Sequence, residues 1–524
     1  MSISKKEKII WTGVILCFSI VNALGHTYES TASRNGVLLF LLWFAASFVI
    51  VGVLSVLGAR GLGLLSNRSS QSTDYSLKKL GLMVGLLLVV YGVVLLCCYP
   101  GVITWDTRDQ IWQVLGKEEM DNHHPLFLTY VIGVFIRFGR HINNFGLGLF
   151  FFEIVQVICA VMAEMYSVWI VNKSTKNTGI SNCLYIFWLL NPIVIIYTIT
   201  VGKDTSFAIC LLFFISSLAE AMLIRKSINK RLFIQIVLSP ILTGLVRHNG
   251  VYVIILSLIF LIMAKREFRK SFVLIFASFL LLLGLRNVVY YHIVGVAPPE
   301  DAEKYSIVFQ TTARVLEDHE EELSLEQVGI IENVLGDISL VKENYDPQLS
   351  DPVKDLYNAE LNSTDKRRFF KQWVALFFKY PGSYISATYD QTYGYFYPDY
   401  SNNVKCFFRL SSDARLLETV KIGLKFPNIV ARINDAVEMI RTAPILRYFM
   451  SMATYNWILI CVFIGALIKK DGDKILLALP LLGTLATILL SPVNGYLRYM
   501  YPIIYCVPFV LLVSAADSSN HISS

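Results

Sequence analysis

Residues 80–98 read LGLMVGLLLVVYGVVLLCC, and the stretch YPGVITWDTRDQIWQV follows directly at residues 99–114. The first segment has about 20 apolar residues without a charge, enough for a helix to cross a hydrocarbon core roughly 30 Å thick. The second begins with Pro-Gly, which ends a helix, and continues with acidic and aromatic residues. This alternation of apolar runs with polar loops recurs along the chain and indicates a polytopic membrane protein.

The composition supports a membrane protein and argues against a nucleic-acid partner. Hydrophobic residues make up 55% of the 524 and charged residues only 16%, too few to cover a soluble protein of this size. The net charge of +7 comes from basic residues clustered in short loops between apolar runs, which is the positive-inside pattern. Lys5, Lys6 and Lys8 therefore predict a cytoplasmic N-terminus before an uncleaved first span, and Arg60 and Arg68 predict a second cytoplasmic loop.

The predicted fold is an all-α polytopic membrane protein with about 12 to 13 transmembrane helices and an extracytoplasmic, mostly helical insert. The count stays open because Pro125–Gly139 has only about 15 residues and is either a short crossing or a re-entrant or tilted helix. The predicted parts are two spans and a cytoplasmic loop at 1–79, a membrane core at 80–296 with its first extracytoplasmic loop at 99–124, the insert at 297–447, and C-terminal spans at 448–524.

The nine cysteines predict neither a disulfide framework nor a metal site. Eight of them lie in apolar segments, where a thiol behaves as a small hydrophobe, and Cys406 is alone in the insert. No Cys-x-x-Cys or His/Cys spacing typical of a metal site occurs along the chain.

A helix is expected directly after Thr104. At 3.6 residues per turn its sides separate into a polar face with Asp106, Asp109, Gln110 and Gln113 and an apolar face with Trp105, Ile111, Trp112 and Leu115. We expect this helix to lie along the membrane surface and to hold its two carboxylates over the edge of the bilayer. An ordinary interfacial helix whose acids face water is the alternative.

Four more polar groups are predicted on the same side of the membrane: His123-His124, Lys203-Asp204, Arg247 with Asn249, and Arg498-Tyr499. Charges at the ends of membrane helices are costly unless paired or wet, so they often mark a site. Each group taken singly also fits a structural role, such as a helix start, a snorkelling side chain or an aromatic belt. Five groups on one side together predict one extracytoplasmic active site. No metal is required, although Asp106 with Asp109 could hold a divalent ion.

The order of these groups along the chain is itself informative. The motifs, in sequence, are Pro100-Gly101, Asp106, Gln110, His123-His124-Pro125, Gly202-Lys203-Asp204, Arg247-Asn249-Gly250 and Arg498-Tyr499-Pro502. This order resembles the GT-C superfamily of membrane glycosyltransferases, in a largely uncharacterised bacterial branch. The resemblance covers about Tyr99 to Pro502, without the first two spans, and the insert matches no known pattern. The chain departs from the superfamily in its acidic pair, here Asp106 and Asp109, and in having a single Pro125 where two prolines are usual.

The resemblance implies a GT-C-like fold and the transfer of a sugar from a polyprenyl-phosphate-linked donor to a cell-envelope glycan, lipid or polymer outside the cell membrane. Asp106 matches the superfamily's loop aspartate and is the expected base, with Asp109 as the second catalytic candidate. The residues expected to bind substrate are Gln110, His123, His124, Lys203, Asp204, Arg247, Asn249, Arg498 and Tyr499.

Three other functions remain open at this point. A polysaccharide polymerase or ligase would use arginines on the large outer insert rather than an aspartate at the membrane surface. A transporter or flippase for lipid-linked glycans predicts acids near mid-membrane, for which Glu153 and Glu164 are the nearest candidates. A non-catalytic membrane partner of cell-envelope enzymes is the third.

Overall fold

The apolar runs form a bundle of helices in the computed structural model, which describes residues 4–29, 37–50, 52, 75–297, 301–400, 424–491 and 493–515. Arg60, Arg68 and Cys406 lie outside these ranges. The helices of the membrane part are α1 (Lys5–Glu29), α3 (Leu77–Cys97), α6 (Phe145–Thr175), α7 (Thr178–Leu190), α8 (Pro192–Thr198), α9 (Lys203–Ala219), α10 (Lys230–Val246), α11 (His248–Ala264), α12 (Arg269–Asn287), α21 (Met452–Ile468), α22 (Gly472–Leu489) and α23 (Leu497–Ser514). The eight cysteines in these ranges are all free.

Seven helices in the described ranges are long and apolar enough to cross a membrane, or eight if the bent pair α7–α8 forms one span. This confirms a helical membrane protein. The predicted number of about 12 to 13 spans is larger, partly because three further apolar helices, Val37–Ile50, α11 and α21, have 17 residues or fewer. The short segment Pro125–Gly139 forms α5 (Leu126–His141), a helix of 16 residues that is not among the seven candidate spans.

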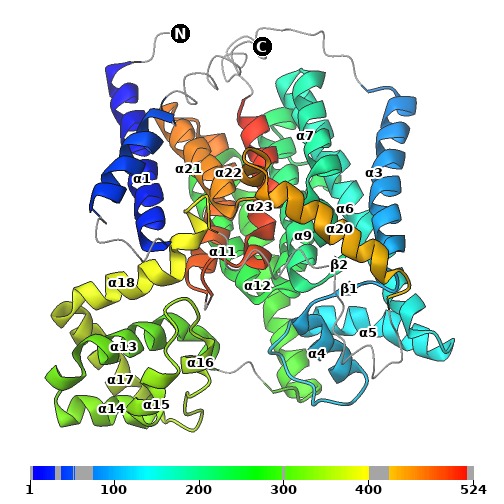
Figure 1. Cartoon of the computed structure of the whole chain (residues 1–524). Helices are drawn as coiled ribbons and strands as arrows, with labels where there is room; N and C mark the ends of the chain where they lie inside the picture. The colour runs from blue at the N-terminus through cyan, green and yellow to red at the C-terminus, as the bar shows by residue number, and fades with distance from the viewer. Residues whose placement is uncertain are drawn as a thin grey trace.

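The centre of the bundle is formed by α9 and α23, which are mostly buried, whereas few residues of α1, α3 and α12 are buried. Figure 1 shows α1 and α3 on opposite flanks of this centre. Helices that are apolar all round suit the bundle interior, and edge helices with outward-facing leucines suit contact with lipid tails.

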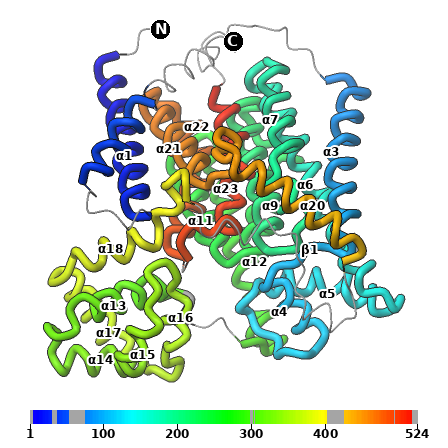
Figure 2. Tube along the Cα trace, in the orientation of Figure 1, coloured from blue at the N-terminus to red at the C-terminus, as the bar shows by residue number. Residues whose placement is uncertain are grey.

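One end of the bundle carries the functional candidates. Figure 1 and Figure 2 show that α1 begins and α23 ends at one end, while α4 (Trp105–Val114), α5 and the insert lie at the other. The basic loops meet at the first end, where Lys265 after α11 pairs with Asp473 at the start of α22. The structure therefore places the basic loops and the polar groups at opposite ends, as the sequence predicts.

A sharp break divides α7 from α8 at Asn191-Pro192, where the axes bend by 63°. Proline has no backbone N–H to continue the helix and disfavours helical geometry at the residue before it. The Asn191 side chain accepts hydrogen bonds from the N–H groups of Ile193 and Val194, which caps α8, and its amide donates to the Tyr455 hydroxyl at 3.0 Å. The break is thus stabilised within the bundle.

The insert forms a separate helical lobe with a core of its own (Figure 1). Its helices are α13 (Ser306–His319), α14 (Leu325–Leu335), α15 (Ile338–Glu343), α16 (Asp351–Lys354), α17 (Ser363–Lys379) and α18 (Pro381–Thr392). Phe309, Leu316 and Phe369 are among its buried residues. After it comes α20 (Pro427–Thr442), whose Val430 and Val437 are buried in the core of the membrane part instead.

Candidate active site

Two very short strands place the first acidic motif beside the Lys203 motif. β1 (Val102–Ile103) pairs in parallel with β2 (Thr200–Val201), so that Ile103 lies opposite Val201. Each strand leads within two residues into a helix, β1 into α4 and β2 into α9. Parallel strands end at the same edge, so the first turns of these two helices are adjacent. The Thr107 hydroxyl donates to the Val201 carbonyl at 2.7 Å and fixes α4 against this edge.

Most of the predicted site residues lie at or beside helix starts, whereas Asp109 and Gln110 lie farther along α4. Asp106 is in the first turn of α4, His124 immediately precedes Pro125 at the start of α5, Lys203 and Asp204 open α9, Arg247 caps α11, and Arg498 is in the first turn of α23. Helix starts carry backbone N–H groups without helical acceptors and a partial positive charge, which together suit an anion. This arrangement follows from topology, because each segment enters the bundle from the same end.

Asp106 is held by two cations. Its carboxylate lies 2.8 Å from Lys203 Nζ and 2.9 Å from Arg498 Nη1, and its side chain is 15% exposed. Burial alone would raise the pKa of Asp106, but the charges of Lys203 and Arg498 outweigh it and hold this pKa well below its usual value. Asp106 is therefore a carboxylate at any physiological pH while these partners surround it.

A second carboxylate, Asp204, extends the network. It lies 2.5 Å from Arg247 Nη1 and 3.3 Å from Arg498 Nε, so Arg498 bridges both aspartates. The aromatic ring of Tyr499 is in cation–π contact with both arginines, 5.4 Å from Arg247 and 5.2 Å from Arg498. Three cations, including Lys203, thus face the carboxylates Asp106 and Asp204, which leaves one excess positive charge in a nearly buried cluster.

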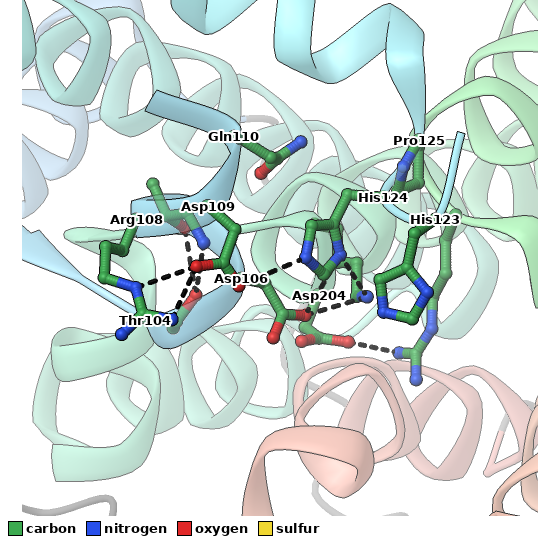
Figure 3. A network of polar contacts seen from close by, with 12 residues as sticks. Thr104, Asp106, Arg108, Asp109, Gln110, His123, His124, Pro125 and Asp204 are labelled. Carbon is green, nitrogen blue, oxygen red and sulfur yellow. Dashed lines mark hydrogen bonds and ion pairs between the residues drawn. The ribbon is translucent and has the colours of Figure 1, made fainter. Parts of the chain in front are cut away.

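His124 connects this cluster to Asp109, as Figure 3 shows. Its Nδ1 lies 3.4 Å from Lys203 Nζ, and its Nε2 lies 3.6 Å from Asp109. Burial lowers the pKa of His124, the contact with Asp109 raises it, and Lys203 lowers it further, with a net lowering. The neutral ring fits these neighbours with Nε2–H toward Asp109 and the Nδ1 lone pair toward Lys203, an assignment made from the network. Asp109 also pairs with Arg108 at 2.6 Å.

The surroundings of Asp109 differ from those of Asp106. Burial raises the pKa of Asp109, but His124 and Arg108 outweigh it, so that the pKa is lowered. Its side chain is 28% exposed, and Arg108 lies between the rings of Trp105 and Trp112, 4.5 Å from each. Asp109 therefore belongs to the outer rim of the site.

The structure brings together seven of the eleven predicted site residues in one ion-pair and cation–π network: Asp106, Asp109, His124, Lys203, Asp204, Arg247 and Arg498. Tyr499 joins them through its ring. The remaining three are Gln110, His123 and Asn249, of which His123 lies beside the network, with its ring centroid 4.7 Å from that of His124. Gln110 is fully buried and donates to the Thr129 hydroxyl at 2.9 Å, joining α4 to α5. His123 is exposed beside His124, and Asn249 lies half-buried in the first turn of α11.

Several contacts that hold the segments of the site in place could not be predicted from a pattern in the sequence. Glu153 of α6 accepts a hydrogen bond from the Val102 N–H at 2.8 Å and so holds β1. Gly101 lies directly against this carboxyl group, because a Cβ built there would be 2.4 Å from Glu153 Oε1, and its φ of +147° also disfavours a side chain. His248 Nε2 lies 3.0 Å from the Asn122 carbonyl oxygen and ties α11 to the loop before α5.

Metal binding finds little support in the donor set. No group of three or more His, Cys, Asp or Glu side chains that could hold an ion occurs among the described residues. Asp106 and Asp204 are instead in contact with Lys203, Arg247 and Arg498, whose positive charges would repel a cation. The network as it stands suits an anion.

Comparison with known proteins identifies the family. No curated protein matches the chain. Among solved structures, it is similar to the crystal structure of ArnT from Cupriavidus metallidurans bound to undecaprenyl phosphate, with a TM-score of 0.31 and 11% identity, over 82% of this chain and 77% of that one. A similarity this loose carries no argument about fold or chemistry. The model of one family, described as "Family of unknown function (DUF6020)", matches residues 115–524. The chain belongs to this family.

Proposed function

We propose that this protein is a glycosyltransferase that moves a sugar from a polyprenyl-phosphate-linked donor to an extracytoplasmic glycan, lipid or polymer of the cell envelope. The observation that carries the proposal is the excess positive charge of the network formed by Lys203, Arg247 and Arg498 with two aspartates. Such a cluster, at converging helix starts on a membrane protein, suits the phosphate of a lipid. The motif order supports the sugar as the transferred group.

The roles of the residues follow from the transfer chemistry. The acceptor hydroxyl attacks the anomeric carbon, its proton goes to Asp106, and the bond from the sugar to the phosphate oxygen breaks. Lys203, Arg247 and Arg498 hold the polyprenyl phosphate that leaves, which stabilises the charge that develops on it. Products are the glycosylated acceptor and the polyprenyl phosphate, with one proton transferred to the carboxylate.

The ion pairs of Asp106 make its basicity depend on the donor. A carboxylate paired with Lys203 and Arg498 is a weak base, because its pKa is held low. A donor phosphate that takes up these cations weakens both pairs and raises the pKa of Asp106 toward the range useful for proton transfer. The base is thus activated when donor is bound.

The experiment measures sugar transfer by purified protein from a panel of radiolabelled polyprenyl-phosphate sugars to cell-envelope extract. We expect transfer by the unmodified protein and its loss in Asp106→Asn at equal folded yield. The matched control is Asp355→Asn, which changes an exposed carboxylate of the insert and is expected to retain full activity. Full activity in Asp106→Asn would make Asp109 the next candidate base, and no transfer from any donor would contradict the proposal.

A transport function has less support from the buried acids. Glu164 accepts hydrogen bonds from the Tyr91 and Tyr505 hydroxyls at 3.0 and 2.9 Å, and Glu153 accepts from the Val102 N–H. Both carboxyl groups therefore have structural partners that join one helix to another segment. A transporter would need such groups along a path for its substrate.

A further inference from the structure

The insert exposes an apolar stripe that its own core does not explain. Phe369 and Leu376 of α17 are buried within the insert, yet the opposite face of the same helix exposes large apolar side chains. The stripe consists of Phe370, Val374, Phe377 and Phe378 of α17 and Ile385 of α18. Phe378 is 76% exposed and Ile385 is 68% exposed. A helix that is apolar on both faces has a second apolar environment to contact.

Basic residues flank the stripe on the same side. Arg367 and Lys371 lie three residues before Phe370 and Val374, respectively, which places them on the outward face of α17, and both are exposed. Lys379 follows at the end of the helix and is also exposed. A face that combines large apolar side chains with Lys and Arg is typical of helices that lie in the interface of an anionic bilayer.

Two ring contacts fix the position of the stripe relative to the membrane helices. Tyr28, at the end of the span α1, is in edge-to-face contact with Tyr389 of α18, with ring centroids 5.7 Å apart. Ile385 is one helical turn before Tyr389, or about 6 Å along the helix at 1.5 Å per residue. Phe377 in turn contacts Tyr384 at 5.4 Å. The stripe therefore begins next to the level at which α1 leaves the membrane, and Figure 1 shows α18 between this end of α1 and the other helices of the insert.

We propose that the stripe inserts into the bilayer leaflet on the side of the candidate active site and holds the insert against the membrane surface. Phe370, Val374, Phe377, Phe378 and Ile385 enter the boundary between headgroups and acyl chains, and Arg367 and Lys371 contact lipid phosphates. The chain that follows α18 enters the core of the membrane part, where Tyr393 and Tyr395 are buried, and this keeps the stripe close to the lipid surface. A small apolar area is then enough for stable contact. The insert then stands in a fixed orientation beside the site.

The test uses the full chain in nanodiscs that contain zwitterionic and anionic phospholipids. A fluorescent non-canonical amino acid replaces Phe378, and its quenching is measured with iodide in the water and with phospholipids that carry a nitroxide on the upper acyl chain. The matched control has the same probe at Leu325, a residue of the insert that is 91% exposed and lies outside the stripe. Both positions are exposed, so neither change disturbs the insert core.

We expect iodide to quench the probe at position 378 at least about threefold less than the probe at 325, and the nitroxide lipids to quench only the former. Replacing Arg367 and Lys371 by glutamine is expected to reduce the nitroxide quenching at 378 in anionic nanodiscs. Equal iodide quenching at the two positions would overturn the proposal, because the stripe would then face water. Shielding from iodide without quenching by nitroxide lipids would also overturn it, and would assign the stripe to a second copy of the chain or another protein.

Discussion

Replacing Asp106 by asparagine should tighten the binding of a polyprenyl phosphate while it abolishes transfer. The change removes one negative charge from a cluster in which Lys203 and Arg498 lie 2.8 and 2.9 Å from the carboxylate, and it preserves the shape of the side chain. In the unmodified protein, a phosphate must share these cations with Asp106. In the variant, both cations are available to it.

The size of the effect follows from the ion-pair distance. A phosphate oxygen that contacts Lys203 on the side away from Asp106 lies about 6 Å from the carboxylate, roughly twice the 2.8 Å pair distance. Two unit charges at about 6 Å repel by about 3 kcal/mol at an effective dielectric constant of about 20. Screening at this partly exposed position reduces the repulsion to about 2 kcal/mol, which corresponds to a Kd lowered roughly thirtyfold.

The assay is equilibrium binding of a radiolabelled polyprenyl monophosphate to the protein in nanodiscs at physiological ionic strength. Asp109→Asn is the control, because Asp109 pairs with Arg108 and is more exposed; we expect its Kd to change by less than about threefold. An unchanged or weaker affinity in Asp106→Asn would refute the reasoning, since the cations around Asp106 would then not be the ones that bind the phosphate.

Three further predictions concern stability, each read from thermal unfolding in detergent. Arg498→Lys is expected to lower the free energy of unfolding by about 3 kcal/mol, because one ammonium group cannot bridge the carboxylates of Asp106 and Asp204. An unchanged unfolding temperature would contradict this bridging role. The folded pKa of His124 is lowered, so the unfolded chain binds more protons and stability falls as the pH drops below the unfolded pKa of about 6.5. His124→Gln should flatten this dependence on the acid side of about pH 7, and an unaltered slope would assign the dependence to another group. Gly101→Ala should lower the free energy of unfolding by about 3 kcal/mol, because φ is +147° there and the added Cβ clashes with Glu153. Gly116→Ala should lower it by only about 1 kcal/mol, because φ is +70° but the added Cβ meets no other atom. Equal losses of stability in the two variants would show that the clash with Glu153 does not contribute.

The sequence alone predicts the class of fold and most of the polar residues that the structure brings together, for one physical reason. Polar and charged residues are rare in apolar spans, so Asp106, Lys203 and Arg498 are conspicuous, and the positive-inside pattern places them at one end. Helical periodicity predicts which residues of α4 share a side, but not which side is buried: Gln110 and Gln113 of the predicted polar face are buried, and Trp105 of the predicted apolar face is 63% exposed. The predicted GT-C-like chemistry stays a proposal, as does the orientation of the bundle in the membrane.

The contact partners of these residues on other segments could not be predicted. Helical periodicity indicates the face of the helix on which a residue lies, but not which segment packs against that face. Gln110 shares the polar face of α4 with Asp106, yet its partner is Thr129 of α5. Glu153 stands in a long apolar helix and is as compatible with a transport path as with its actual contact, the Val102 N–H. Strands of two residues, such as β1, are too short to show an alternating pattern.

The bridging position of Arg498 has a consequence for how the protein is made. Arg498 and Asp106 are separated by 392 positions in the sequence, and Arg498 belongs to α23, the last span of the described chain. During synthesis, α4 and α9 enter first, so Asp106 and Lys203 can pair long before Arg498 leaves the ribosome. The full set of cations exists only after α23 has inserted between its neighbours. A partly inserted chain therefore has an incomplete ion-pair network, and a phosphate site of the kind proposed here would be complete only after α23 is in place.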